Sequence, residues 1–405
     1  MYKPPAAAPE ALQYLVGDAH QALDRRPLTP YGEQALDFLS ALSKALLDDP
    51  SAKPYPDVVA FAFWCRMAHL RQLKQQFAQE PVRLGLGLVF HITPANVEIN
   101  FAYSFAFALL AGNANVVRVP SAHFAQVELV CRHMAALCAQ PRHATLASMT
   151  AFVRYAQNDA ITAEFSRQCN ARMVWGGNQT IRQIAKSELP ARSVELRFSD
   201  RYSFCVLAAD AVLQCTPDAL HKLAIGFYND SYLTDQNACS APHLLVWVGS
   251  DADCRNAQAR FWEAVLAVVE QRYALQALVA VDKLVQACQN AIDVPQVSGL
   301  TRHGNYIYRL QLSRLDAGVT GLRGTGGLFY ECSVPHFEAV TPIVNTSYQT
   351  LAYFGMDRLA LQRTVVEQRL CGIDRIVPVG QTLDIGVIWD GYDIVRSLSR
   401  IVDVR

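Results

Sequence analysis

Apolar residues recur along this chain with two spacings, which together predict alternating strands and helices. Residues 84–92 are almost continuously apolar and predict a buried strand. Residues 99–110 predict a buried helix that ends at Gly112, and residues 115–119 predict a second strand. Strand, helix and strand make a βαβ unit, whose parallel strands are expected to be buried on both faces. Asn96 follows the first strand, at the edge where open α/β sheets bind ligands.

The rest of the N-terminal half continues this alternation. Residues 31–47 and 58–77 have helical periodicity, and we expect these helices to pack on the first sheet. Residues 171–177 predict a strand that breaks at two glycines, and residues 203–208 predict another. The pattern therefore predicts N-terminal helices and a first α/β domain over residues 1–210.

A second α/β domain is predicted over residues 211–385. It contains a polar loop before the apolar strand 243–248, the glycine-rich loop 321–327 and a strand over 373–379. Residues 386–405 form a C-terminal tail. Its last five residues predict a short strand that has no following partner.

Cys239 is the candidate nucleophile. It lies among small and polar residues in the loop before strand 243–248, where a rigid strand would hold a sulfur in place. A structural, unreactive cysteine is the alternative. His243 lies four residues later and invites a Cys/His pair, but its apolar neighbours favour a structural role in the strand.

Composition limits the classes of binding partner and the cellular compartment that we expect for this chain. The chain has 405 residues, enough for two domains, and its net charge of zero gives no reason to expect nucleic acid or an anionic membrane. Eleven cysteines without a CxxC pair, and no signal-peptide pattern, indicate a reducing cytoplasmic location without disulfides. The longest apolar run is shorter than a membrane span. No metal-binding spacing is present, so no catalytic metal is expected.

Four motifs, in order, resemble one family: the aldehyde dehydrogenase superfamily and, within it, the LuxC-type acyl-CoA reductases. The motifs are His91–Asn96, Ala108–Ala114 with Val117–Arg118, Asp235–Pro242, and Gly372–Gly380 with Trp389–Tyr392. The resemblance covers roughly residues 84 to 405. It implies an α/β, aldehyde-dehydrogenase-like fold with a variant Rossmann cofactor domain and an α/β catalytic domain.

The resemblance also implies a cofactor site, although no GxGxxG follows a strand. Trp175, Gly176 and Gly177 match the family's pyrophosphate-binding turn. Arg118 matches a family lysine near the adenosine ribose, and Ser121 stands where many NAD-using members have a glutamate. Without that carboxylate, and with an arginine nearby, a 2′-phosphate is accommodated, which favours NADPH over the alternative, NADH.

Two further cofactor and catalytic positions follow from the resemblance. Glu331 is matched to a family glutamate that holds the nicotinamide ribose. Glu195 aligns with the glutamate that activates the hydrolytic water in oxidising members, but the glycines that follow it there are missing here. Weak hydrolysis favours reduction over aldehyde oxidation.

The implied reaction begins with attack of Cys239 on the carbonyl of an acyl-CoA or acyl-carrier thioester. The Asn96 amide and the Cys239 backbone N–H stabilise the oxyanion, and NADPH reduces the acyl-enzyme to the aldehyde. The turn at Trp389–Asp390 is expected to shape the acyl pocket. The alternatives are an NAD(P)-dependent aldehyde dehydrogenase, a cofactor-independent thiol acyltransferase or hydrolase, and a non-catalytic subunit of an acyl-transfer complex.

The family also supplies expectations about assembly. Its C-terminal tail completes a sheet in a neighbouring subunit, so we expect a homodimer or a larger assembly, with the tail covering an exposed sheet edge. An acyltransferase or synthetase is an expected protein partner.

Overall fold

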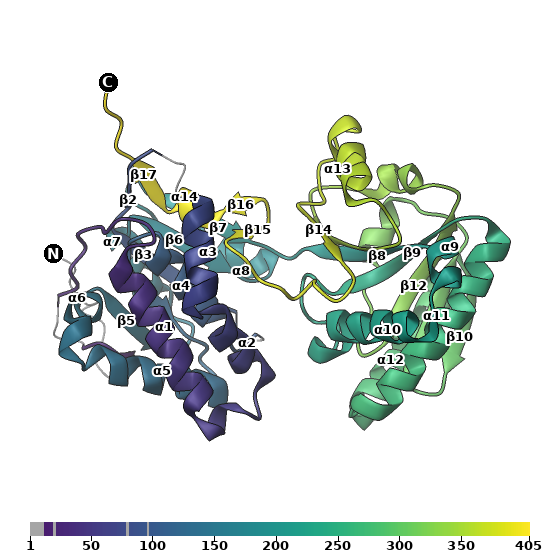
Figure 1. The fold of residues 1–405 in the computed structure, drawn as a ribbon, viewed down its shortest axis with the longest axis horizontal. Coiled ribbons are helices and arrows are strands. Elements are labelled where there is room, and N and C mark those ends of the chain that lie inside the picture. The colour runs from purple at the N-terminus through teal and green to yellow at the C-terminus, as the bar shows by residue number, and fades with distance from the viewer. Residues whose placement is uncertain (1–11, 19–21, 78–80, 95–96) are drawn as a thin grey trace. The chain divides into compact units, whose positions relative to one another are not determined.

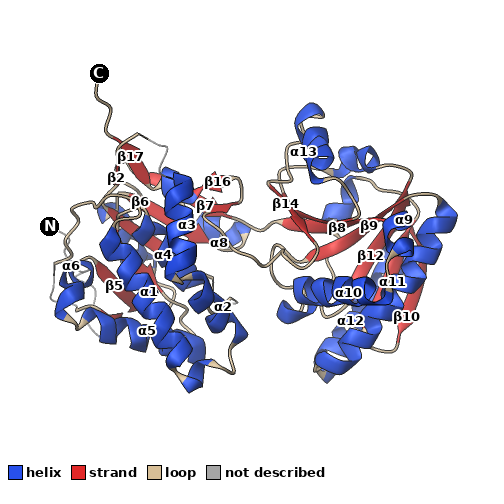
Figure 2. Ribbon diagram, in the orientation of Figure 1, coloured by secondary structure: helices blue, strands red, loops and turns tan. Residues whose placement is uncertain are grey.

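The computed structural model describes residues 12–18, 22–77, 81–94 and 97–405, and the chain divides into two compact units. Unit 1 comprises the chain up to Ser199 together with Tyr392–Arg405, and unit 2 comprises Asp200–Gly391. Both are built of helices around a mainly parallel sheet (Figure 1, Figure 2). The boundary between the two units comes earlier in the chain than the boundary expected at residue 210, because strand 202–208 belongs to the second sheet. The tail from Tyr392 onward belongs to unit 1.

Unit 1 contains a six-stranded sheet in the order β1-β5-β4-β3-β6-β7. Its strands are β1 (Gln13–Val16), β3 (Leu88–Ile92), β4 (Ala114–Arg118), β5 (Thr150–Arg154), β6 (Ala171–Trp175) and β7 (Val194–Phe198). Only β1, among the described strands of this sheet, runs antiparallel to its neighbour. The chain builds outward from β3 to β4 and β5, then returns to place β6 on the other side of β3. The order of the strands therefore reverses between β3 and β6, and this is where open α/β sheets bind ligands.

The predicted βαβ unit is present. Helix α4 (Asn100–Leu110) connects β3 and β4, which pair in parallel, and all of its residues are buried. The helix ends before Gly112, which has a φ of +84° and lies against the Leu28 carbonyl, where a Cβ would come within 2.1 Å of the oxygen. Glycine is therefore required at this C-cap.

The N-terminal helices pack on α4, the helix that connects β3 and β4. Phe38 of α1 contacts Phe105, and Trp64 of α2 contacts Tyr103 and Phe107. The predicted helix over 58–77 is interrupted near Cys65. The helices of unit 1 are α1 (Glu33–Asp48), α2 (Pro56–Trp64), α3 (Met67–Phe77), α4, α5 (Ala125–Cys138), α6 (Ala144–Ser148), α7 (Asp159–Gln168), α8 (Asn178–Ile184) and α14 (Ile394–Ser397), with short 3-10 turns η2 (Pro50–Ala52) and η3 (Pro141–His143).

The C-terminal strand lies over residues 399–401, earlier than the predicted 401–405. β17 (Ser399–Ile401) pairs antiparallel with β2 (Arg83–Gly85) of the same chain, and the Val402 N–H donates to the Val82 carbonyl. The predicted strand over 84–92 is therefore two strands, because Gly87, with a φ of +128°, separates β2 from β3. β16 (Tyr392–Asp393) leads into this C-terminal segment.

Unit 2 contains a seven-stranded sheet in the order β10-β11-β12-β9-β8-β13-β14. Its strands are β8 (Tyr202–Ala208), β9 (Pro242–Val248), β10 (Val297–His303), β11 (Ile307–Leu312), β12 (Leu328–Val334), β13 (Tyr348–Phe354) and β14 (Arg375–Pro378), followed outside the sheet by β15 (Ile388–Trp389). The β10–β11 pair is antiparallel and the other pairs are parallel.

Alternate residues of β8 enter two different hydrophobic cores, one on each face of this sheet. Phe204 and Val206 pack on one side, and Cys205 and Leu207 on the other. Burial on both faces explains why the central strands are uniformly apolar. The helices of unit 2 are α9 (Ala209–Gln214), α10 (Pro217–Ser231), α11 (Asp251–Arg272), α12 (Ala277–Asp293) and α13 (Arg358–Glu367), with 3-10 turns η4 (Tyr232–Thr234), η5 (Ala317–Gly321) and η6 (Phe337–Ile343). Among the described residues, no helix has the length and apolar character that crossing a membrane would require.

Candidate active site

Cys239 lies in a loop that unit 2 holds rigidly at the amino-terminal edge of its parallel strands. The loop begins with Asp235 and Gln236, whose φ angles of 50° and 61° turn the chain sharply after η4. Gln236 is buried: its Nε2 donates to the Leu328 carbonyl at 3.1 Å and its Oε1 accepts from the Gly327 N–H at 2.8 Å. The loop is therefore fixed to the start of β12, and the cysteine that follows has a defined position.

Ser203 fixes the backbone of the cysteine itself. Its hydroxyl donates to the Cys239 carbonyl oxygen at 2.7 Å and accepts from the Thr350 N–H at 3.2 Å. The register between β8 and β13 shifts here, so that Gln349 and Thr350 together lie opposite Ser203. Such a bulge leaves backbone groups unpaired and redirects a side chain. Here the Thr350 N–H donates to the Ser203 hydroxyl, so β13 lies next to the loop that carries Cys239.

The side chain that meets the cysteine sulfur is Gln349. Its Nε2 lies 3.5 Å from Cys239 Sγ and also donates to Asp390 Oδ1. Gln349 is fully buried and Asp390 is 8% exposed. A cation also lies beside this carboxylate, because Arg201 Nη1 is 3.9 Å from Asp390 Oδ1. Arg201 in turn pairs with Asp374.

These surroundings determine the acidity of the thiol. Burial raises the pKa of Cys239 to about 11, and the negative charge of Asp390 contributes to the rise; the Gln349 hydrogen bond and the Arg201 charge oppose it. Burial also raises the pKa of Asp390. Cys239 is partly exposed nevertheless. With this pKa the thiol is mostly protonated at neutral pH.

His243 has the structural role that the sequence favoured. It is buried in β9, and its Nδ1 accepts a hydrogen bond from the Gly324 N–H at 3.2 Å. Burial, with a contribution from Arg323, lowers its pKa to about 4, so the imidazole is neutral at physiological pH. Its described hydrogen bond supports the glycine-rich loop.

Five of the predicted cofactor residues, Arg118, Ser121, Trp175, Gly176 and Gly177, lie in unit 1. In the sheet, Ile92 at the end of β3 pairs with Arg118 of β4 on one side and with Val174 of β6 on the other. Arg118 and the turn at Gly176–Gly177 therefore lie on the two sides of the point where the strand order reverses. Ser121 follows β4 and is exposed.

The individual contacts refine this picture. The Arg118 guanidinium lies over the Tyr155 ring, 4.5 Å from its centroid. The Trp175 indole stacks on Phe198 and donates from Nε1 to Ser104 Oγ at 3.0 Å, so this side chain belongs to the core. Gly177 has open space where a Cβ would stand. Within this turn it is thus the glycine backbone that a ligand can approach. Asn96 lies outside the described residues.

Glu195 is held in ion pairs on β7. Its Oε1 accepts from Arg172 Nε at 2.6 Å and its Oε2 accepts from Arg197 Nε at 2.6 Å. The Arg172 side chain is only 1% exposed, so Glu195 neutralises a buried charge. A carboxylate occupied in this way is poorly placed to activate water, which does not favour the catalytic role that the resemblance implied for Glu195.

Glu331 also requires a correction. It is 1% exposed on β12, where its Oε1 accepts from the indole nitrogens of Trp247 and Trp262, at 2.8 and 2.7 Å, and its Oε2 accepts from Arg309 Nε at 2.6 Å. With both oxygens engaged inside the core, this residue is not available to a ribose. The sequence match placed a structural carboxylate in a binding role.

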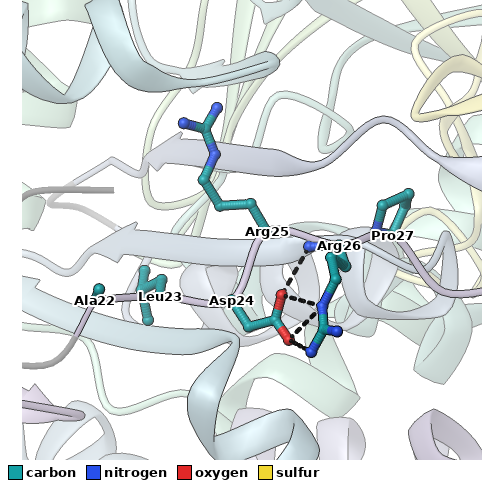
Figure 3. A pocket seen from close by; sticks show the side chains of 6 residues that line it. All are labelled: Ala22, Leu23, Asp24, Arg25, Arg26 and Pro27. Atoms are coloured by element: carbon teal, nitrogen blue, oxygen red, sulfur yellow. Dashed lines mark hydrogen bonds and ion pairs between the residues drawn. The ribbon is translucent and has the colours of Figure 1, made fainter. Parts of the chain in front are cut away.

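A surface pocket of unit 1 offers no reactive group. It is lined by residues 22–27, and Figure 3 shows Arg26 engaging both carboxylate oxygens of Asp24 while Arg25 extends away from them. Arg25 donates to the Gln168 carbonyl and to Asn170 Oδ1. The charged side chains here are thus engaged in structural contacts. Within the described parts of the chain, no His, Cys, Asp and Glu side chains cluster as metal ligands.

Comparison with protein families decides the assignment. Residues 58–278 match the family model described as acyl-CoA reductase (LuxC). The chain belongs to the LuxC acyl-CoA reductase family. The matched segment contains both the βαβ unit with Arg118 and the Cys239 loop, and the expected resemblance is confirmed. No curated protein shows significant sequence similarity to this LuxC-family chain.

Solved structures show the same fold. The chain is similar to a salicylaldehyde dehydrogenase from Pseudomonas putida G7 complexed with salicylaldehyde, with a TM-score of 0.62, 14% identity, and coverage of 92% of this chain and 84% of that one. It is similar to a mutant of the Thermus thermophilus 1-pyrroline-5-carboxylate dehydrogenase, with a TM-score of 0.61, 12% identity, and coverage of 92% and 80%. A Thermus 1-pyrroline-5-carboxylate dehydrogenase with bound NAD matches with a TM-score of 0.61, 11% identity and the same coverage. The expected fold class, α/β and aldehyde-dehydrogenase-like, is confirmed.

Sequence reasoning missed the partners of the cysteine. Gln349 was detectable only as a polar residue inside an otherwise largely apolar strand, and nothing nearby in sequence connects it to Cys239. Asp390 was noticed as part of a turn, without its charge being considered. Ser203 was included only as the first residue of a predicted strand.

Proposed function

We propose that this LuxC-family chain reduces an acyl thioester, such as a fatty acyl-CoA, to the aldehyde with NADPH through an acyl group carried on Cys239. The observation that carries the proposal is the position of Cys239: a partly exposed residue whose loop is fixed on both sides, by Gln236 and by Ser203. A nucleophile must be held in this way to attack reproducibly. The family match includes this residue.

The cofactor proposal rests on whether unit 1 fits a phosphorylated dinucleotide. The open backbone at Gly177, directly before α8, suits the close approach of a pyrophosphate. Arg118 and Ser121 lie at the end of β4, on the far side of β3 from this turn. A guanidinium with no carboxylate at position 121 is suited to a 2′-phosphate, so the residues present fit NADPH.

The chain's own groups account for the first half of the reaction. The Cys239 sulfur forms a bond to the thioester carbonyl carbon, and the carbonyl electrons move to oxygen, where the Cys239 N–H and Asn96 are the proposed donors. The carbonyl reforms as the bond to the carrier sulfur breaks, and the carrier leaves as a thiol after taking up the proton that Cys239 gave up on attack. An acyl group then remains on Cys239.

The second half releases the product. NADPH, when bound, supplies a hydride to the acyl carbon. The resulting oxyanion is again held by the Cys239 N–H and Asn96, and its collapse breaks the carbon–sulfur bond to free the aldehyde and the cysteine. Glu195 is paired with two arginines, which disfavours its use as a base for hydrolysis. We further propose that the chain acts in the cytoplasm as a homodimer or larger assembly, with an acyltransferase or synthetase as partner.

Arg118→Ala should weaken NADPH binding at least about tenfold while changing NADH binding much less, because the lost guanidinium is the proposed contact of the 2′-phosphate. Fluorescence titration of the purified chain with each cofactor measures both affinities. Arg142→Ala, in η3 on the segment leading into β5, is the matched control and should leave both unchanged. An equal loss for the two cofactors would remove the basis for NADPH preference.

The proposed function is tested by steady-state turnover. NADPH consumption should depend on added acyl-CoA, with one aldehyde formed per NADPH consumed. Rapid reduction of NADP⁺ by aldehyde in the absence of CoA would instead assign the chain as an aldehyde dehydrogenase. Release of free CoA without NADPH would assign it as a thiol hydrolase or acyltransferase.

A further inference from the structure

We propose that Gln349 is a side-chain donor to the Cys239 sulfur and that Asp390 is the positioning residue that fixes the orientation of the Gln349 amide. This inference rests on the proposed role of Cys239 as nucleophile and adds two residues to its machinery. Both lie outside the segment that matches the family model, which ends at residue 278.

Both the nitrogen and the oxygen of the Gln349 side-chain amide form contacts. One N–H of Nε2 is directed at Cys239 Sγ and the other at Asp390 Oδ1, while Oε1 accepts from the Thr350 hydroxyl at 3.3 Å. The side chain is 0% exposed, so water cannot replace a lost partner. The amide is consequently held by three interactions rather than free to rotate.

Asp390 decides which end of the amide faces the sulfur. If the amide were turned by 180°, Oε1 would face a carboxylate oxygen, and two acceptors would repel each other without a hydrogen between them. The observed orientation instead places an N–H donor toward both Asp390 and Cys239. Asp390 is itself held next to Arg201 and follows Trp389, whose ring lies under the Arg375 guanidinium.

The two residues act on the sulfur in opposite directions. An N–H donor stabilises a thiolate more than a thiol, because the anion is the stronger acceptor. The carboxylate of Asp390 repels the same anion. Arg201, Arg375 and Asp200 also act electrostatically on Cys239. The site therefore fixes the position of the sulfur and places an N–H donor and a carboxylate with opposing effects on its thiolate beside it.

The bulge in β13 explains how a core strand presents this side chain. Because Gln349 and Thr350 together oppose Ser203, the strand bends at the point where it passes the cysteine loop. Without the bulge, the residues of β13 would stay paired one to one with those of β8 at this point. The same bulge thus delivers Gln349 to the sulfur and Thr350 to the serine that holds the cysteine carbonyl.

The test is the pH profile of alkylation at Cys239 by iodoacetamide, quantified by peptide mapping of the full-length chain. Gln349→Met keeps the length of the side chain and removes the donor. Asp390→Asn removes the charge and keeps an oxygen that can accept from Gln349. Cys288, exposed on α12, is alkylated in the same sample and serves as the internal reference. Gln258→Met, at a buried glutamine of α11, is the matched control.

The expected shifts have opposite signs. Gln349→Met should move the alkylation midpoint to higher pH and slow the reaction at pH 8 about tenfold, since the thiolate loses its donor. Asp390→Asn should move the midpoint to lower pH and accelerate the reaction by about the same factor. Neither change should alter the rate at Cys288, and Gln258→Met should match the parent chain.

Other outcomes overturn the inference. A merely structural role would loosen the loop in both variants and accelerate alkylation in both, and an absence of change in both would mean that neither residue acts on the sulfur. Acyl-CoA labelling of Cys239 is measured separately in the parent chain. If the opposite shifts appear but no acyl adduct forms, the proposed function fails while the assignment of Gln349 and Asp390 stands.

Discussion

Replacement of Cys239 by serine should reduce acyl-CoA-dependent NADPH consumption at least about 1,000-fold, because the hydroxyl is a far weaker nucleophile than the sulfur and has no free base beside it in the described part of unit 2. The neighbouring imidazole, His243, is occupied by the Gly324 N–H. Cofactor binding should be retained, because the proposed cofactor residues lie in unit 1. Absorbance at the NADPH band and fluorescence titration measure the two properties in one preparation.

Cys288→Ser is the matched control for this substitution. Cys288 is exposed on α12, and its replacement should leave the rate unchanged. Activity of Cys239→Ser within tenfold of the parent chain would mean that the reaction does not pass through this sulfur, and the assignment of the site would have to be abandoned.

Glu331→Ala should destabilise unit 2 by about 3–5 kcal/mol, because it leaves a buried charge and two buried indole N–H groups without a partner. Arg309, whose side chain is 11% exposed, would lose its ion pair, and Trp247 and Trp262 would lose their shared acceptor. The midpoint of denaturant unfolding, followed by tryptophan fluorescence, measures the loss.

Glu338→Ala provides the comparison for Glu331. Glu338 lies in η6 with its side chain 51% exposed, and its removal should change stability by less than about 0.5 kcal/mol. If Glu331→Ala unfolded like the parent chain and bound NADPH more weakly, the ribose contact suggested by the sequence would be restored.

Much of the fold followed from local pattern. The helix over residues 100–110 and its flanking strands were predictable because continuous burial and a C-terminal glycine are properties of the segment itself. The split of residues 83–92 was not, because it depends on Gly87 turning the chain and on β2 pairing with β17, more than 300 residues away. The place of β8 in the second sheet is likewise set by pairing with β9 and β13.

The residues of the site likewise divide into those that local sequence identified and those that it did not. Cys239 and Arg118 were identifiable because each is part of a contiguous motif. Gln349 was not, because its contact with the sulfur arises from a bulge between two strands whose residues are far apart in sequence. Glu331 was wrongly predicted to bind the ribose. The sequence around a glutamate in an apolar strand does not show which buried arginine and indole groups will form hydrogen bonds with it.

The central claim is that the acyl group is carried on Cys239 and leaves it by reduction. The most direct measurement mixes the chain with a fatty acyl-CoA without cofactor, records the intact mass, maps the modified peptide, and then adds NADPH. The account predicts one acyl adduct on Cys239 that disappears as NADPH is consumed and aldehyde appears in equal amount. An adduct that is lost to water at the same rate with and without NADPH, or an adduct mapped to another residue, would contradict it.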